Sequence, residues 1–230
     1  MNEIEELWKE IREKAKKSFP FFLFNFVKTF DYNDKFNPVK NFPEKESFLY
    51  LAKEITKERF IAIPKSRQVM ITWFICAYLV WRANFYPNYF IVVKSTKADK
   101  SGWGMADSNE TNLMGDLQAL LSRCYFIYYH LPEKLKTFVI TSKRPSVIKF
   151  IHYIKEYEAP SIIMGATSNP EELRQYTINI LFMDEVAFQK DARMAYFSTI
   201  PALTKDGQVI LVSTPNGKEF FHNIVYDIEL

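Results

Sequence analysis

The sequence predicts an α/β fold in which a mainly parallel sheet carries helices on both faces. Three observations favour this fold. Short apolar runs of strand length alternate along the chain with longer segments of helical pattern. Most positions in these runs are apolar, as in strands that are covered on both faces. Three of the runs also end in polar residues that suit a ligand site at the carboxyl edge of such a sheet.

The N-terminal part of the chain is expected to pack on this core. Residues 2–17 place apolar side chains at helical spacing and predict an amphipathic helix that packs on the domain or, alternatively, docks on a partner. Residues 19–43, rich in aromatic residues, Asn, Asp and Pro, predict an irregular layer, and 44–57 predicts a helix. No boundary is evident, so 1–230 is expected to form a single domain in which 1–43 covers the core.

The remaining elements follow from the apolar runs. Residues 71–83, apolar on every side, predict a helix held between the sheet and other elements. Residues 98–130 are expected to be mostly helical, with a mobile loop at 99–112. The predicted strands are Arg59–Ile63, Tyr89–Val93, Val147–Ile151, Ser161–Met164, Asn179–Met183 and Gln208–Val212.

Composition and charge exclude several classes of protein. The net charge of +3 comes from 30 basic and 27 acidic residues and is too balanced to indicate a nucleic-acid partner by itself. Cys76 and Cys124 have no paired spacing, so neither a disulfide framework nor a zinc site is expected. The apolar run 19–27 is nine residues long. A membrane span needs about 20 residues, so no span or targeting segment is expected.

The first candidate site is the loop 63–72, IPKSRQVMIT, between a predicted strand and a predicted helix. A phosphate-binding loop needs inward-pointing backbone N–H groups, a lysine near the β- and γ-phosphates and a helix that opens with Ser or Thr for Mg²⁺. Thr72 supplies the hydroxyl, and Lys65 stands at the entrance of the loop instead of directly before the hydroxyl residue. A surface turn is the alternative for this loop taken alone.

Two other runs end in candidate catalytic residues. The run INILFMDE ends in Asp184 and Glu185, and adjacent carboxylates at the end of a buried strand are costly unless a cation compensates them. Asp184 would hold Mg²⁺, and Glu185 would orient or deprotonate an attacking water. In VILVSTPNG, Ser213 and Thr214 would sense the γ-phosphate or hydrogen-bond Glu185. The alternative for the acids is a solvated strand end, and the alternative for Ser213 and Thr214 is an ordinary exit from a strand into a turn. The order of the three motifs and their shared sheet edge favour NTP hydrolysis.

With these motifs the chain resembles the ATPase domain of a large terminase subunit, the DNA-packaging motor of tailed bacteriophages, over about residues 40–217. The family's phosphate loop commonly reads S-R-Q-x-G-K-T or K-S-x-R-x-G-x-S, and the loop here matches part of each form, with Met70 in place of glycine. The resemblance implies that Lys65 takes the role of the displaced lysine. The implied nucleotide-binding residues are Lys65, Ser66, Arg67, Gln68, Val69, Met70, Ile71 and Thr72.

The other motifs extend the resemblance. DEVA is similar to the family's D-E-x-A element and STPNG to its coupling motif, and ELRQYT is similar to an L-R-G-x-x segment. The last match implies that Arg174 is an arginine finger acting across a subunit boundary, with a surface arginine as the alternative. The implied roles are metal binding by Thr72 and Asp184, catalysis by Glu185 and Arg174, and coupling by Ser213 and Thr214.

The resemblance implies a P-loop NTPase core of the ASCE/RecA-like type that uses ATP and Mg²⁺ to drive double-stranded viral DNA into a prohead. The implied partners are double-stranded DNA, the portal protein, the small terminase subunit and further copies in a ring, with a monomer in isolation, no membrane, and the host cell cytoplasm as location. Large terminases continue into a nuclease domain. The chain ends at residue 230, 13 residues after Gly217, so an excised ATPase domain is expected, or a nuclease on another chain.

Two other functions stay open on the sequence alone. A helicase-like ATPase would need a second motor domain, and a loop with Met70 that no longer binds nucleotide would leave a structural or DNA-docking domain. A run of basic residues between Glu133 and Glu156 is either a solvated face or a contact to the DNA backbone. It comprises Lys134, Lys136, Lys143, Arg144, Lys149 and Lys155.

Overall fold

The structure, a computed structural model, describes residues 3–67, 69–103, 113–166, 170–217 and 220–226. Its centre is a seven-stranded sheet with strand order β3-β11-β10-β4-β9-β6-β5. The first five strands in this order are parallel, and β6 and β5 join the far side as antiparallel strands. The strands are β3 (Phe60–Pro64), β4 (Phe90–Lys94), β5 (Val139–Lys143), β6 (Ser146–Phe150), β9 (Ser161–Gly165), β10 (Ile178–Asp184) and β11 (Leu203–Ser213).

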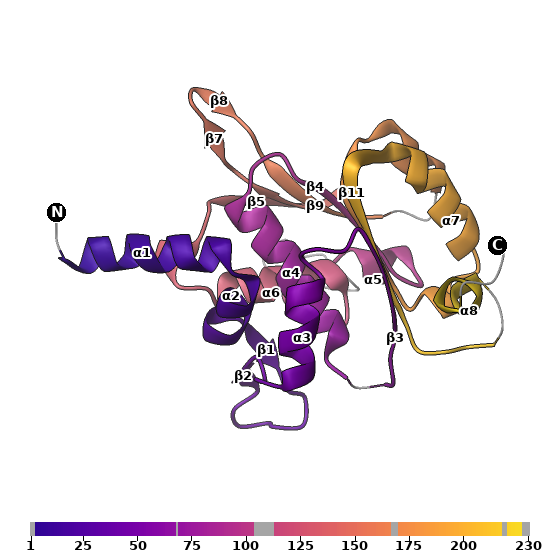
Figure 1. The fold of residues 1–230 in the computed structure, drawn as a ribbon, viewed down its shortest axis with the longest axis horizontal. Helices are drawn as coiled ribbons and strands as arrows, with labels where there is room; N and C mark the ends of the chain where they lie inside the picture. Colours follow the sequence, from indigo (N-terminus) through magenta and orange to yellow (C-terminus); the bar gives the residue numbers. More distant parts are fainter. Residues whose placement is uncertain (1–2, 68, 104–112, 167–169, 218–219, 227–230) are drawn as a thin grey trace.

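Helices cover both faces of this sheet (Figure 1). Alternate side chains of β10 enter two separate cores: Ile180 and Phe182 pack on one face, and Leu181 and Met183 on the other. The predicted α/β class is therefore confirmed. The first face carries α2 (Phe19–Phe26), α3 (Glu46–Glu54), α4 (Ile71–Phe85) and α6 (Leu120–Tyr129), and the second carries α7 (Ala192–Thr199) and α8 (Phe220–Val225).

Smaller elements complete the fold. A short hairpin, residues 28–41, lies at the bottom of the view in Figure 1, and a second hairpin, residues 153–158, projects at the top. Within the described ranges, no helix combines the length and the apolar character needed to cross a membrane. The smaller elements are α1 (Glu3–Lys17), β1 (Lys28–Phe30), β2 (Val39–Asn41), α5 (Ala98–Ser101), β7 (Tyr153–Ile154), β8 (Tyr157–Glu158) and the 3₁₀ helices η1 (Glu133–Leu135), η2 (Pro170–Gln175), η3 (Val186–Phe188) and η4 (Ile200–Ala202).

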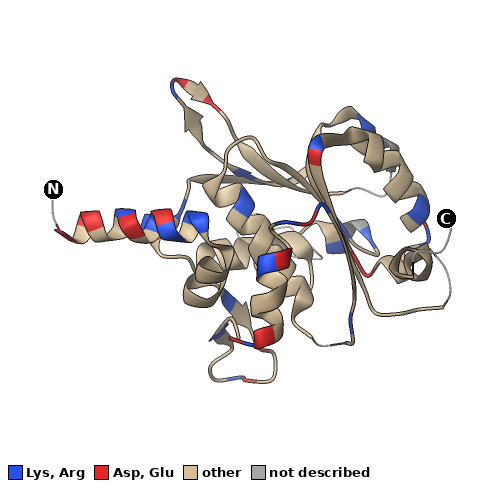
Figure 2. Ribbon diagram, in the orientation of Figure 1, with Lys and Arg blue, Asp and Glu red and all other residues tan. Residues whose placement is uncertain are grey.

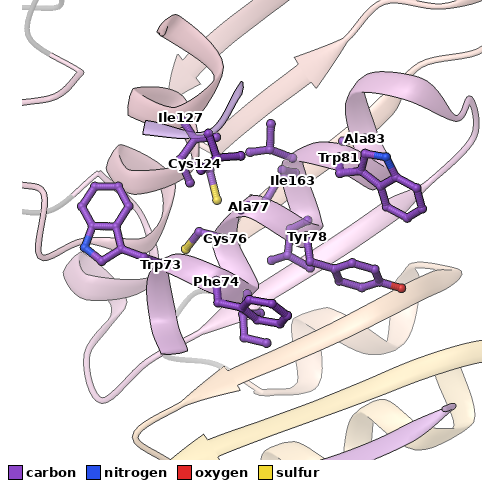
Figure 3. Packing of buried hydrophobic residues seen from close by; sticks show 14 of the residues in the cluster. Trp73, Phe74, Cys76, Ala77, Tyr78, Trp81, Ala83, Cys124, Ile127 and Ile163 are labelled. Carbon is purple, nitrogen blue, oxygen red and sulfur yellow. The ribbon is translucent and has the colours of Figure 1, made fainter. Parts of the chain in front are cut away.

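Helix α4 forms the centre of the larger core. Every residue of α4 except Arg82 is buried, as its uniformly apolar sequence predicts. Phe74 packs edge-on against Phe19 of α2 and stacks on Phe48 of α3, with ring centroids 5.5 and 5.8 Å apart. Figure 3 shows the same helix packed against Cys124 of α6. The first turn of α4 is therefore held in a fixed place at the sheet edge.

The expectation of an irregular layer at 19–43 is wrong for its first part, because residues 19–26 form helix α2. Pro20 occurs in the first helical turn, where its missing N–H group is not needed. Ser18 caps the helix by accepting a hydrogen bond from Phe21 N at 3.3 Å. The later part of the layer contains the β1–β2 hairpin, which places polar side chains near the carboxyl edge of the sheet.

Helix α1 extends away from the sheet with its acidic end outermost and its basic end nearest the core (Figure 2). Its middle part is anchored by Trp8 and Ile11, which pack against the larger core, and by Arg12, which donates to Lys134 O at 3.2 Å. Its last part is anchored by Trp81 Nε1, which donates to Ala15 O at 2.8 Å, and by Tyr86 Oη, which donates to Lys16 O at 2.7 Å. Ile4 is 61% exposed in the outer half. The predicted amphipathic helix is therefore present and packs on the domain through its middle and its C-terminal end.

Two other expectations need correction. Among the described residues of 98–130, helix is confined to α5 and α6, and most of the predicted mobile loop, residues 104–112, lies outside the described residues. The predicted strand at 147–151 runs antiparallel to β9, and its partner β5 was not predicted because its sequence, VITSK, is partly polar. The basic run lies on η1, β5, β6 and the β7–β8 hairpin, where Lys149 pairs with Glu158 at 2.5 Å.

Candidate functional site

The three predicted motifs meet at the carboxyl edge of the sheet. Strands β3, β11 and β10 are direct neighbours, and their ends are in register: Pro64 pairs with Ser213, and Asp184 pairs with Val212. Lys65 N continues the pairing by donating to Ser213 O at 2.9 Å. Because parallel strands end at the same edge, residues that are more than a hundred positions apart in sequence lie side by side here.

Lys65, Glu185 and Thr214 form a chain of polar contacts across this edge. The Lys65 Nζ atom lies 2.6 Å from Glu185 Oε1, and the Thr214 hydroxyl donates to Glu185 Oε2 at 3.0 Å. Thr214 N donates to the same oxygen at 3.3 Å. Glu185 adopts a left-handed backbone conformation with φ of 54°. This conformation costs roughly 1–2 kcal/mol in a residue with a side chain, and such strain is concentrated at functional sites.

Thr72 and Asp184 form the second contact of the site. The Thr72 hydroxyl lies 3.2 and 3.3 Å from the two carboxylate oxygens of Asp184, and both residues are buried. Thr72 is in the first turn of α4, where the helix dipole favours negative charge. Met70, in the family's glycine position, precedes the helix with φ of 7° and ψ of 16°, and its side chain packs against the core.

The two neighbouring acids have opposite pKa shifts. Burial raises the pKa of Asp184 to about 6, and the charge of Glu185 adds to this, although Lys65, Arg123 and Thr72 oppose it. Burial also raises the pKa of Glu185, but the ion pair with Lys65 and the hydrogen bonds from Thr214 outweigh burial and hold it below its ordinary value. Glu185 is therefore ionised at neutral pH, and Asp184 is a buried acid that gains from a nearby cation.

Hydrogen bonds tie the segment after β10 to the end of β11. Gln189 Nε2 donates to Asp184 O at 2.8 Å, and Ala187 N donates to Ser213 Oγ at 3.1 Å. Asn216 Nδ2 donates to Ala187 O at 3.2 Å. A displacement of the Asp184–Glu185 turn would therefore be passed to the residues that follow β11.

A cavity of about 830 Å³ opens in front of these residues. This volume is within the roughly 300–1,000 Å³ of small-molecule sites. One end is formed by the loop, by α4 and by the paired acids, and the other end by the β1–β2 hairpin. Its lining comprises Lys65, Val69, Met70, Ile71, Thr72, Trp73, Asp184 and Glu185 at the first end, and Thr29, Phe30, Asp31, Tyr32, Asn33, Lys40, Asn41 and Pro43 at the second. Ser95, Lys100, Gln118 and Arg123, the last of which is on α6, complete the lining.

Some predicted site residues do not line this cavity. Ser66 and Arg67 are exposed and outside its lining, and Gln68 lies outside the described residues. Arg174 is exposed on η2, and two residues later Tyr176 stacks on Phe90 at the amino end of β4, with ring centroids 4.8 Å apart. Arg174 therefore does not contact the cavity of its own chain.

The hairpin and Arg123 were missed by the sequence analysis. The hairpin turn DYND carries a signal for a loop but none for a cavity, since its place depends on how it packs below α6. Arg123 lies within LLSRCYFIYY, an otherwise ordinary buried helix, and no local pattern distinguishes it. Both reach the site only through tertiary packing.

The oxygen atoms of Thr72 and Asp184 fit a magnesium ion that accompanies a nucleotide. Mg²⁺ prefers oxygen ligands, and proteins commonly bind it through one or two carboxylates while phosphates and water complete its shell. In the parts of the chain that the structure describes, no group of three or more His, Cys, Asp or Glu side chains could hold a metal ion alone. A cation would also compensate the buried Asp184 carboxylate.

Replacing Asp184 with asparagine is expected to stabilise the free protein above pH 6. Burial raises the folded-state pKa from 3.8 to about 6, so ionising this group opposes folding. The penalty is absent below about pH 4 and complete above about pH 6, where two pKa units correspond to about 3 kcal/mol. Asparagine removes the charge and keeps an acceptor for Thr72.

Urea unfolding of both proteins in EDTA, at pH 5 and pH 8, measures this effect. The gain in unfolding free energy should be about twice as large at pH 8 as at pH 5, given the pKa values above. A variant that is less stable than the original protein at pH 8 would show that the Asp184 carboxylate is not disfavoured in the fold.

Similarity to known proteins is found among solved structures. No family model matches the sequence, and no curated protein matches it. Among solved structures, the chain is similar to the ATPase domain of the Thermus phage P74-26 large terminase, with 16% identity and a TM-score of 0.56 over 79% of this chain and 69% of that chain. It is also similar to the large terminase of bacteriophage HK97, with 11% identity and a TM-score of 0.64 over 92% of this chain and 40% of that chain.

A third similar structure is the large terminase of the thermophilic bacteriophage D6E in complex with ADP, with 12% identity and a TM-score of 0.54 over 80% of this chain and 43% of that chain. The chain thus spans less than half the length of the HK97 and D6E proteins. Similarity at this level of identity establishes a shared fold. The chain has the fold of large terminase ATPase domains, and the predicted α/β fold with a mainly parallel sheet is confirmed.

Proposed function

We propose that this chain is the ATPase domain of a large terminase subunit, which hydrolyses ATP with Mg²⁺ to drive double-stranded viral DNA into a prohead. One observation carries the proposal: Lys65 and Thr72 of the loop meet Glu185 and Asp184 at one sheet edge, at distances of 2.6 and 3.2–3.3 Å. The shared fold and the ADP complex of one structural neighbour support it.

In this proposal the loop end of the cavity binds the phosphates. Lys65 and the backbone N–H groups of the loop contact the β- and γ-phosphates, and Thr72 and Asp184 hold Mg²⁺. The bound ion would neutralise charge on the phosphates. The hairpin end of the cavity leaves room for the nucleoside.

Glu185 is the proposed group that orients water and accepts its proton. The water oxygen forms a bond to the γ-phosphorus as the bond to the β–γ bridging oxygen breaks, which yields ADP and inorganic phosphate. Lys65 now holds Oε1 of Glu185, but an ammonium group has three N–H donors. Lys65 therefore either contacts Glu185 and the phosphate together or leaves Glu185 for the phosphate. If Lys65 leaves, the pKa of Glu185 would rise and Glu185 would become a better base.

The remaining predicted residues would act beyond the reacting atoms. Thr214 contacts Glu185 directly, and Ser213 contacts the turn after β10, so both are placed to pass the state of the site to the chain after β11. The exposed position of Arg174 suits a finger that acts on a neighbouring subunit in a ring. The isolated chain would then be a monomer with slow turnover. The portal protein, the small terminase subunit and DNA are the proposed partners, in the host cell cytoplasm.

Calorimetric titration of MgATP into the purified chain, followed by an assay of phosphate release, tests the proposal. One MgATP should bind per chain, and slow hydrolysis should stop in EDTA. Addition of proheads and double-stranded DNA should accelerate it. Absence of MgATP binding would instead favour a structural or DNA-docking domain, and unwinding of a duplex would favour a helicase.

A further inference from the structure

Four basic side chains line the cavity within the described residues, and three of them have an acidic partner. Lys65 pairs with Glu185 at 2.6 Å, as described above. Lys100 Nζ lies 2.9 Å from a carboxylate oxygen of Asp116, and Lys40 Nζ lies 2.6 Å from one of Asp34. The fourth, Arg123, has no acidic partner among the described residues.

The Arg123 side chain is nevertheless held in place. Its Nε atom donates to Leu117 O at 2.6 Å, and its guanidinium carbon lies 5.5 Å from the centre of the Trp73 ring. Leu117 and Trp73 are both buried, so these two anchors are rigid. Neither Nη atom has a hydrogen-bond acceptor among the described residues. The two Nη atoms of Arg123 are therefore held in position and are available to bind a ligand.

Arg123 shares the lining of the cavity with residues of both ends, Asp184 at the loop end and Tyr32 at the hairpin end. Trp73, on which Arg123 stacks, directly follows Thr72 in the chain. Arg123 thus lies between the two ends of the cavity.

We infer that Arg123 binds the phosphate groups of the nucleotide, from α6, while Lys65 binds them from the end of β3. A guanidinium with two free Nη atoms matches two phosphate oxygens at once, whereas a nucleobase offers no such pair of anionic acceptors. This inference rests on the proposed function of the cavity and adds a phosphate contact that no loop residue provides.

Titration of MgATP and of inorganic tripolyphosphate against Arg123→Gln, Arg123→Lys and the unchanged chain tests the inference. Arg123→Gln should weaken the binding of both ligands by about 10–100-fold, because charge-assisted bidentate contacts are among the strongest hydrogen bonds. Arg123→Lys keeps the charge without the fork and should fall between the two. The control is Arg193→Gln on α7, where Arg193 stacks on Phe197 at 5.9 Å and the same charge is lost on the other face. It should bind both ligands normally.

The outcomes separate this inference from the proposed function. Normal MgATP affinity in Arg123→Gln, with binding lost in Lys65→Ala, would overturn the inference and leave the proposed function intact. Weakened ATP binding with unchanged tripolyphosphate binding would place Arg123 at the base or ribose and would also overturn it. If the unchanged chain binds neither ligand, both fail. Thermal unfolding of each variant shows whether it is folded, and Arg123→Lys supplies the result if Arg123→Gln is not.

Discussion

Replacing Glu185 with glutamine should lower the rate of ATP hydrolysis by about 10²–10⁴-fold, which is the usual contribution of a general base. Glutamine keeps the shape of the side chain and a hydrogen bond to Thr214, but it is a far weaker base for the proton of the attacking water. MgATP affinity should be unchanged or slightly higher, because Lys65 no longer has an anionic partner that competes with the phosphates. Glu185→Ala should lose hydrolysis in the same way.

Single-turnover hydrolysis and calorimetric binding, measured on the same preparation, check this prediction. Glu158→Gln is a matched control, because Glu158 also pairs with a lysine, Lys149 at 2.5 Å, but lies on the β7–β8 hairpin away from the cavity. The control should hydrolyse ATP normally. Unchanged turnover in Glu185→Gln would remove Glu185 from the catalytic role.

Replacing Lys65 with alanine should weaken MgATP binding by about 100-fold or more, since hydrogen bonds to charged groups contribute roughly 1.5–3 kcal/mol each. The Lys65 side chain is only 10% exposed and pairs with the carboxylate of Glu185, the proposed base, in addition to its proposed contact with the phosphates. Its removal therefore also leaves Glu185 without its ion-pair partner, and some loss of stability is expected.

Two further variants separate the loss of binding from the loss of stability. Lys65→Ala combined with Glu185→Gln has no unpaired carboxylate at position 185, although Asp184 still lacks the charge of Lys65. Its stability should therefore partly return while MgATP binding stays weak. Lys94→Ala removes another buried lysine, paired with Asp191 at 2.9 Å, that does not line the cavity. It should lose stability and keep its MgATP affinity. Normal MgATP binding by Lys65→Ala would contradict the role of Lys65.

The sheet edge was predictable from the sequence because it depends on local signals. Strands such as β10 are read from their apolar runs, and parallel neighbours must end at a common edge. The residues directly after three such runs, Lys65, Asp184 with Glu185, and Ser213 with Thr214, therefore had to lie near one another. The helix that begins at Ile71 followed from its uniformly apolar pattern.

The rest depends on packing that no short segment encodes. Helix α2 was hidden because Pro20 suggests a break, although the first turn of a helix tolerates proline. The hairpin and Arg123 line the cavity only because α6 packs on α4 and the hairpin packs on α6. The absence of glycine at Met70 suggested a weakened loop, yet the Met70 side chain packs against the core in front of α4.

The most direct test is a crystal structure of the chain with Mn²⁺ and a non-hydrolysable ATP analogue. The anomalous signal of manganese should lie beside the Thr72 hydroxyl and the Asp184 carboxylate, with the γ-phosphate analogue within hydrogen-bonding distance of Lys65 Nζ. An analogue bound elsewhere on the chain, or manganese that contacts neither Thr72 nor Asp184, would contradict the proposal that these residues share one nucleotide.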